Sequence, residues 1–130
     1  MAARPFHYSF PVRDLDEARR FYGGLLACAE GRSAPTWVDF DFFGNQLSAH
    51  LGAPTAAAAT GQVDGVAVPI PHFGAILDPG EFEALAARLR AAGVGFLVEP
   101  RLRFEGRPGE QHTMFFRDPS GNAIEIKAYR

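Results

Sequence analysis

Four histidines and one carboxylate near the end of the chain are the side chains that could carry out metal or acid–base chemistry. They are His7, His50, His72, His112 and Glu125. Glu125 lies on the polar face of a strand predicted at 122–128, opposite three apolar side chains. Two neutral imidazoles and one carboxylate form a facial metal-binding triad with open coordination positions. No HxH or HExxH spacing occurs, so from the pattern alone an ordinary solvent-exposed face is the simpler interpretation.

The elements that would position these residues occur twice along the chain. Each half begins with a strand that carries a histidine near its start, followed by an N-capped helix and then by further strands. The strands predicted in the first half are 6–12, 36–43 and 45–51, and the segment before Pro35 is compatible with another. Those predicted in the second half are 71–77, 95–104, 111–116 and 122–128. The sequence therefore predicts a duplicated unit of mixed helix and strand.

The two halves match best at their ends. The segment DFFGNQLSAHL at 41–51 aligns with MFFRDPSGNAIEIKA at 114–128 if residues 117–120 are an insertion. This alignment places Ser48 at the position of Glu125. Either half alone would expose an apolar sheet face, so we expect the two halves to pack together.

Composition and charge narrow the classes of partner. The 130 residues are 47% hydrophobic and 22% charged with a formal net charge of -2, which gives no reason to expect nucleic acid or an acidic membrane. The single Cys28 cannot form an internal disulfide, which fits a reducing compartment. The opening MAARPF lacks the apolar stretch of a signal peptide, and no run approaches the ~20 apolar residues of a membrane span. We therefore expect a cytoplasmic protein.

Three features of the chain point to one family: the histidine opening each half, the segment PVRDLDEARRFYGGLL at 11–26 and the segment FFRDPSGNAIEI at 115–126. Together they resemble the vicinal oxygen chelate superfamily, which includes glyoxalase I, extradiol dioxygenases, fosfomycin-resistance proteins and bleomycin-binding proteins. The resemblance covers 5–129, and RDPSGNAIEI is its most specific element. It implies an α+β fold in which two βαβββ modules form a curved mixed sheet around a metal-binding trough. The modules would span about 5–52 and 68–129, with a linker at about 53–67, in a single domain of 1–130.

The resemblance also implies a ligand set. Carried over by position, the metal ligands are His7, His72 and Glu125. Glyoxalase I-like members typically use a fourth ligand, a glutamate at the position that Ser48 occupies here. A shift of two residues in the alignment would offer Gln46 or His50 instead, so a fourth ligand stays open.

Within the superfamily the chain is most similar to small extradiol dioxygenase-like members. This similarity predicts ring cleavage of a catechol-type substrate, an aromatic diol, by O₂ at a divalent metal, with Fe(II) favoured and Mn, Zn or Ni as alternatives. His50, His112 or Tyr129 would move a proton or hold a substrate oxyanion, and His50 is preferred because its register follows from the repeat. Because superfamily members are often dimers, a homodimer is expected.

Apart from fosfomycin-type thiol transfer, which no separate motif supports, two other functions fit the same residues. One is glyoxalase I-like isomerase or lyase chemistry on a chelated hydroxycarbonyl, with Ni²⁺ or Zn²⁺. The other is a metal-free binding protein of bleomycin-resistance type, for which the many aromatic residues in strands could form an apolar trough. A metal-free binder would have little need for two histidines and a glutamate together.

Overall fold

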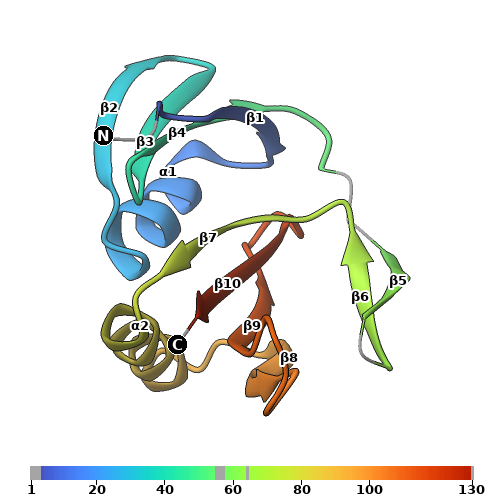
Figure 1. Ribbon diagram of the computed structural model, residues 1–130. Coiled ribbons are helices and arrows are strands. Elements are labelled where there is room, and N and C mark those ends of the chain that lie inside the picture. Colours follow the sequence, from blue (N-terminus) through green and yellow to red (C-terminus); the bar gives the residue numbers. More distant parts are fainter. Residues whose placement is uncertain (1–3, 55–57, 64, 130) are drawn as a thin grey trace. The chain divides into compact units, whose positions relative to one another are not determined.

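The structure is a computed structural model that describes residues 4–54, 58–63 and 65–129. The chain divides into two compact units, Met1–Thr55 and Ala56–Arg130. Each unit holds its own four-stranded mixed sheet together with helical segments (Figure 1). The predicted α+β fold with a repeated module is therefore confirmed, and its main strands form two four-stranded sheets.

The first unit follows the predicted order and adds a strand. Its elements are β1 (His7–Val12), α1 (Leu15–Ala18), the π-helical η1 (Arg19–Leu25), β2 (Ala29–Ala34), β3 (Trp37–Phe42) and β4 (Asn45–Leu51). The strand order is β1-β4-β3-β2, with β1 parallel to β4 and the other pairs antiparallel. The strand that the sequence left open before Pro35 is β2.

One face of this first sheet is apolar and packs on the helical segment. Tyr22 of η1 is fully buried, and its ring centroid lies 5.5 Å from those of both Phe10 on β1 and Phe40 on β3. Because side chains alternate along a strand, this packing directs the neighbouring polar residues, His7 among them, to the opposite face.

The second unit begins with a hairpin that the sequence did not predict. Its elements are β5 (Ala58–Val63), β6 (Val66–Ile70), β7 (Phe73–Leu77), α2 (Pro79–Ala91), β8 (Phe96–Arg103), β9 (Gln111–Arg117) and β10 (Ala123–Tyr129). The segment at about 53–67 is predicted as a linker, whereas β5 and β6 pair there as antiparallel strands. Part of the predicted linker, residues 55–57 and 64, lies outside the described residues.

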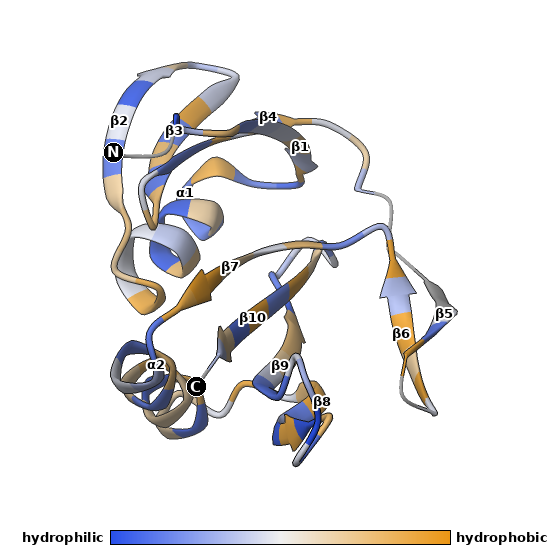
Figure 2. Ribbon diagram, in the orientation of Figure 1, coloured by the Kyte–Doolittle hydropathy of each residue, from blue (hydrophilic) through white to orange (hydrophobic). Residues whose placement is uncertain are grey.

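The main sheet of the second unit has the order β7-β10-β9-β8, with β7 parallel to β10. The apolar side chains of α2 pack on one face of this sheet, where Ile124, Ile126 and Ala128 of β10 are fully buried. Figure 2 shows hydrophilic positions interrupting the apolar ones along β10. Glu125 therefore lies on the face opposite α2.

The strand registers reproduce the sequence repeat residue by residue. In the first unit Ser9 pairs with Ser48, and His7 stands two residues before Ser9. In the second unit Gly74 pairs with Glu125, and His72 stands two residues before Gly74. Ser48 is thus the structural counterpart of Glu125, and His7 that of His72, as the alignment of the Gly-Asn turns predicts.

Gly74 stands where the backbone of β7 passes close to the backbone of β10. A Cβ atom on Gly74 would overlap the backbone carbonyl of Glu125. We expect Gly74→Ala to lower the free energy of unfolding by about 3 kcal/mol, because a well-packed backbone must shift to admit the methyl group. Urea unfolding measures the change, and Gly95→Ala is the matched control because nothing lies within 4 Å of its Cβ position. Equal stability of the two variants would contradict this account of the strand pairing.

The N-terminus of α2 provides a pH-dependent contribution to stability. The backbone N–H of Glu81 donates to Asp78, and this hydrogen bond holds the pKa of the Asp78 carboxyl below its ordinary value of 3.8. A depressed pKa in the folded state stabilises the protein above the unfolded value, and that contribution is lost as the pH falls through the folded pKa. The Tm difference between wild type and Asp78→Ala should therefore be largest at neutral pH and should become smaller below about pH 3.8. Glu83→Ala, which removes another exposed carboxylate of α2, is the control for the loss of one negative charge.

Candidate functional site

Glu125 is a buried carboxylate whose two oxygens have different partners. Its residue is 7% exposed on the face of the second sheet opposite α2. The hydroxyl of Thr113, on the neighbouring strand β9, donates to Oε2 at 2.6 Å. The other oxygen, Oε1, lies 3.2 Å from Nε2 of His72. Thr113 therefore fixes the carboxylate so that Oε1 faces the histidine.

His72 is held from two sides just before β7 begins. Its Nδ1 lies 2.7 Å from the backbone carbonyl oxygen of Pro69. Because a carbonyl oxygen only accepts hydrogen bonds, Nδ1 carries a proton, and Nε2 of the neutral ring is an acceptor. The ring of Phe115 meets the imidazole edge to face, with 4.9 Å between centroids. These contacts orient Nε2 toward Glu125.

The contact between Nε2 of His72 and Oε1 of Glu125 requires a cation, either a proton or a metal ion. In the neutral imidazole both atoms are acceptors, so at 3.2 Å their lone pairs repel unless a proton or a metal ion lies between them. A proton on Nε2 would make an ordinary ion pair. A divalent metal fits the same groups, since metal-binding histidines usually donate their other ring N–H to a carbonyl or carboxylate and metal-binding carboxylates are themselves hydrogen-bonded.

Two basic side chains also approach Glu125. A guanidinium nitrogen of Arg103 lies 3.9 Å from Oε2, and Nζ of Lys127 lies 3.9 Å from Oε1. The Arg103 side chain is 4% exposed, and that of Lys127 is 33% exposed. Within the described part of the chain, Nε of Arg103 has no hydrogen-bond partner. The surroundings of Glu125 therefore hold more positive charge than one carboxylate balances.

The β5–β6 hairpin packs against the same face of the sheet. Val66 and Val68 of β6 contact Val98 and Phe115, which pair with each other across β8 and β9. Arg103 donates to the backbone carbonyl oxygen of Val63 at 2.7 Å. The hairpin is thus attached by an apolar cluster and by the same arginine that approaches Glu125.

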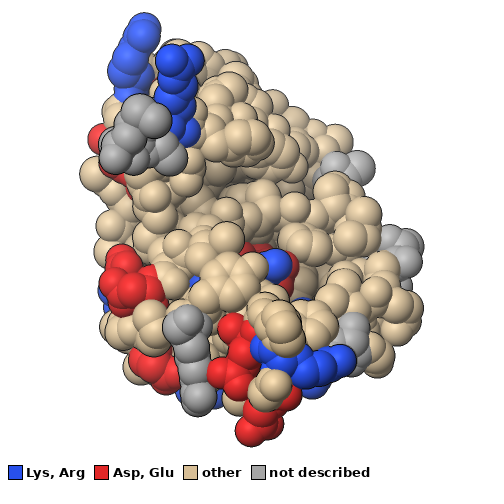
Figure 3. Space-filling view, viewed as in Figure 1, with Lys and Arg blue, Asp and Glu red and all other residues tan. Residues whose placement is uncertain are grey.

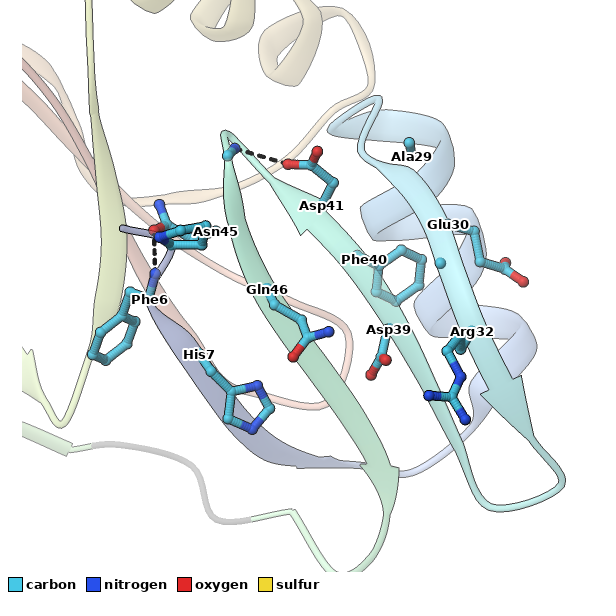
Figure 4. A pocket seen from close by; sticks show the side chains of 13 residues that line it. Phe6, His7, Ala29, Glu30, Arg32, Asp39, Phe40, Asp41, Asn45 and Gln46 are labelled. Carbon is cyan, nitrogen blue, oxygen red and sulfur yellow. Dashed lines mark hydrogen bonds between the residues drawn. The ribbon is translucent and has the colours of Figure 1, made fainter. Parts of the chain in front are cut away.

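His7 lies in the first unit, on the polar face of its sheet. Its Nε2 is 3.2 Å from the hydroxyl of Ser9. It borders a hollow of about 530 Å³ lined also by Gln46, Asp39 and Asp41, and Figure 4 shows His7, Gln46 and Asp39 on the same side of the strands. Ser48 is buried on this face and donates to Asp39 at 2.5 Å.

Among the three predicted ligands, the structure brings His72 and Glu125 together, while His7 belongs to the other unit. Across the described ranges, no three side chains of His, Cys, Asp or Glu gather into a metal-binding cluster. The three-ligand set therefore stays a prediction, and His72 with Glu125 is the part of it that the second unit displays.

The three predicted acid–base residues lie in different surroundings. His50 is exposed on the His7 face of the first sheet, 6.4 Å from the ring of Trp37. Tyr129 is exposed on the Glu125 face of β10, since it follows Glu125 by four residues. His112 packs against Phe82 of α2 at 5.7 Å, on the opposite face of the sheet from Glu125. This placement argues against a role for His112 beside Glu125.

Sequence reasoning missed Arg103 and Thr113. Thr113 pairs with Lys127 across β9 and β10, which places it on the face of Glu125. Both strands are predicted correctly, but the alternation of side chains does not give the register between them, and that register would have identified Thr113. Arg103 ends β8 after irregularities in its pairing with β9, so simple alternation could not have placed it.

The molecular surface agrees with the nearly neutral composition. On the face that Figure 3 shows, acidic and basic side chains lie side by side around α2 and β8, and the described residues of that face form no broad patch of one sign. Within the described residues, no helix is both long enough and apolar enough to span a membrane.

Comparison with known proteins identifies the family. Residues 4–126 match the model of the Glyoxalase/Bleomycin resistance protein/Dioxygenase superfamily. The chain belongs to this superfamily. The resemblance drawn from its histidines and its RDPSGNAIEI segment is thereby confirmed. No match was found among curated proteins.

Solved structures of the superfamily have the same fold. A glyoxalase/bleomycin resistance protein/dioxygenase from Alicyclobacillus acidocaldarius is 36% identical, with a TM-score of 0.78 over 96% of this chain and 90% of that one. The fosfomycin resistance protein FosX from Listeria monocytogenes is 18% identical, with a TM-score of 0.72 over 100% and 96% of the two chains. A glyoxalase/dioxygenase from Nostoc punctiforme is 19% identical, with a TM-score of 0.72 over 95% and 89%. The last two likenesses show the fold alone.

The coupling between Arg103 and Glu125 can be measured by a double-mutant cycle. We expect Arg103→Met to cost about 3 kcal/mol in the free energy of unfolding, because it leaves a buried carboxylate without its nearest guanidinium. Adding Glu125→Gln should recover part of this loss, since the charge that Arg103 balances is then gone. Arg101→Met, at an exposed position on the same strand, is the control and should change stability by no more than about 0.5 kcal/mol. Strictly additive losses in urea unfolding would show that the two residues do not interact.

Proposed function

We propose that this superfamily member is a divalent-metal-dependent enzyme with a two-histidine, one-carboxylate site made of His7, His72 and Glu125. The observation that supports it most directly is the facing pair of acceptor atoms, His72 Nε2 and Glu125 Oε1, 3.2 Å apart. Each is oriented by a backbone carbonyl or a hydroxyl, as metal ligands usually are.

The repeat supports His7 as the third ligand. His7 occupies in the first unit the register position that His72 occupies in the second. It is exposed, and its imidazole is bonded to the side chain of Ser9 rather than buried in the core. A neutral imidazole in that position has a ring nitrogen to offer a metal.

The counterpart of Glu125 in the first unit argues against a fourth protein ligand. Ser48 takes that place, and its hydroxyl donates to Asp39. Three ligands leave open coordination positions, which suits Fe(II), with Mn, Zn and Ni as alternatives. When bound, such an ion supplies a positive centre that holds two adjacent oxygens of a substrate and stabilises their negative charge.

From these features we infer extradiol dioxygenase-like ring cleavage of a catechol-type substrate by O₂. Thr113 and the Pro69 carbonyl would keep Glu125 and His72 in place, and the hairpin valines would exclude water from one side of the site. His50 and Tyr129 are the candidates for moving the proton of a substrate hydroxyl. A homodimer in the cytoplasm also stays a prediction.

Metal analysis after anaerobic purification tests the ligand set. We expect one Fe(II) per chain in the wild type and loss of it in His7→Ala, His72→Ala and Glu125→Gln. Each of these three substitutions should lower metal affinity by more than the roughly 10- to 100-fold that is lost when a residue supporting a ligand is changed. Thr113→Val, which removes the hydroxyl that donates to Glu125, should lower metal affinity within that range. His50→Ala is the matched control and should retain the metal.

The outcomes separate the candidate functions. Fe(II) together with O₂ consumption on a panel of catechols supports the dioxygenase. Bound Ni²⁺ or Zn²⁺ without O₂ consumption, or metal loss in His50→Ala, would instead favour glyoxalase I-like chemistry on a chelated hydroxycarbonyl. A wild type without metal, or undiminished metal in Glu125→Gln, would exclude the proposed site and favour a metal-free binding protein.

A further inference from the structure

Lys127 is the single lysine of a sequence whose other twelve basic residues are all arginines. It follows Glu125 by two residues on β10, so both side chains lie on the face of the sheet opposite α2. Its Nζ lies 3.9 Å from Glu125 Oε1, the oxygen that faces His72. The ammonium group therefore stands on the side of Glu125 where the proposed metal would bind.

This contact is not an ordinary hydrogen-bonded ion pair. A distance of 3.9 Å exceeds that of an N–H···O hydrogen bond. Arg103 approaches the other oxygen of the same carboxylate, so one negative charge has two positive neighbours. A single buried cation would suffice to balance Glu125, and Arg103 is the buried one. The ammonium of Lys127 is therefore not required to neutralise the charge of Glu125.

The excess of positive charge around Glu125 becomes larger when a divalent metal ion binds. With neutral histidines, Glu125, Arg103 and Lys127 sum to one positive charge, and a divalent ion would raise the sum to three. Positive charge in a partly buried place is costly unless an anion compensates it. A loaded site of this composition therefore favours a ligand that brings negative charge.

We propose that Lys127 is a substrate-binding residue that contacts a negatively charged oxygen of the ligand. This inference rests on the proposed metal site of His72 and Glu125.

Lysine suits this role better than Arg103 does. Its ammonium is a compact charge with three donors on a flexible stem, and a third of the side chain is exposed. Arg103 is almost fully buried and is bonded to the carbonyl of Val63, which ties it to the hairpin. Arg103 is thus a positioning residue, and Lys127 is free to reach a ligand.

The test measures ligand affinity separately from metal affinity. Protein loaded with redox-inert Zn²⁺ is titrated calorimetrically with 4-nitrocatechol, which ionises readily, and with its uncharged dimethyl ether. We expect Lys127→Met to weaken 4-nitrocatechol binding at least about tenfold, the usual loss for a hydrogen bond to a charged group. Lys127→Arg should retain most of the affinity, and Arg101→Met is the control for a general loss of positive charge.

A second measurement uses the wild-type chain and so does not depend on how a variant folds. Because Lys127 is the only lysine, acetylation by an amine-reactive reagent modifies one side chain, which mass spectrometry separates from the N-terminal amine. We expect 4-nitrocatechol to protect Lys127 in the Zn²⁺-loaded protein, and the dimethyl ether to leave it reactive.

The outcomes distinguish the inference from the function on which it rests. A wild type that binds no Zn²⁺ would overturn both. Intact Zn²⁺ binding with equal 4-nitrocatechol affinity in wild type and Lys127→Met would overturn the role of Lys127 alone. Tight binding of the uncharged ether would overturn the contact between Lys127 and a negatively charged oxygen. A purely structural Lys127 would instead change Zn²⁺ affinity and leave ligand affinity unmoved.

Discussion

The approach of His72 Nε2 to Glu125 Oε1 is the interaction on which the second unit is organised. The two atoms lie 3.2 Å apart, a contact that needs either a proton on the imidazole or a metal ion between them, so each needs a partner that fixes its direction. The Pro69 carbonyl and the Thr113 hydroxyl are those partners. Gly74 makes the approach possible, since no side chain stands between β7 and the carbonyl of Glu125. The pairing of β7 with β10 therefore also sets the geometry of His72 and Glu125.

Much of this arrangement follows from the sequence because it depends on local patterns. Alternating apolar residues predict the strands that carry Glu125 and His7, and the Asp78 cap predicts the start of α2. The repeated Gly-Asn turns predict the equivalence of Ser48 and Glu125, which the strand registers reproduce. The family resemblance rests on the same segments, which lie within residues 4–126 that match the superfamily model.

What the sequence could not supply depends on contacts between distant segments. The hairpin is not predicted because β5 consists mostly of small residues and has little apolar alternation. The stability of the hairpin comes from the pairing of β5 with β6 and from the packing of Val68 on Phe115. Arg103 and Thr113 lie near Glu125 because of the register between β8, β9 and β10, which local sequence patterns do not give. His112 lies on the α2 face of the sheet, away from Glu125, because the face of a strand, not its distance along the chain, decides which side chains meet.

The attachment of the hairpin has a consequence for how the protein could diversify. Arg103 binds the backbone carbonyl of Val63, and a carbonyl is present whatever residue stands there. The side chain of Val63 can therefore vary without loss of this bond, while any change at Arg103 affects both the hairpin and the charge near Glu125. Sequence drift in relatives should therefore be tolerated at position 63 and not at Val68, whose side chain is buried against Phe115.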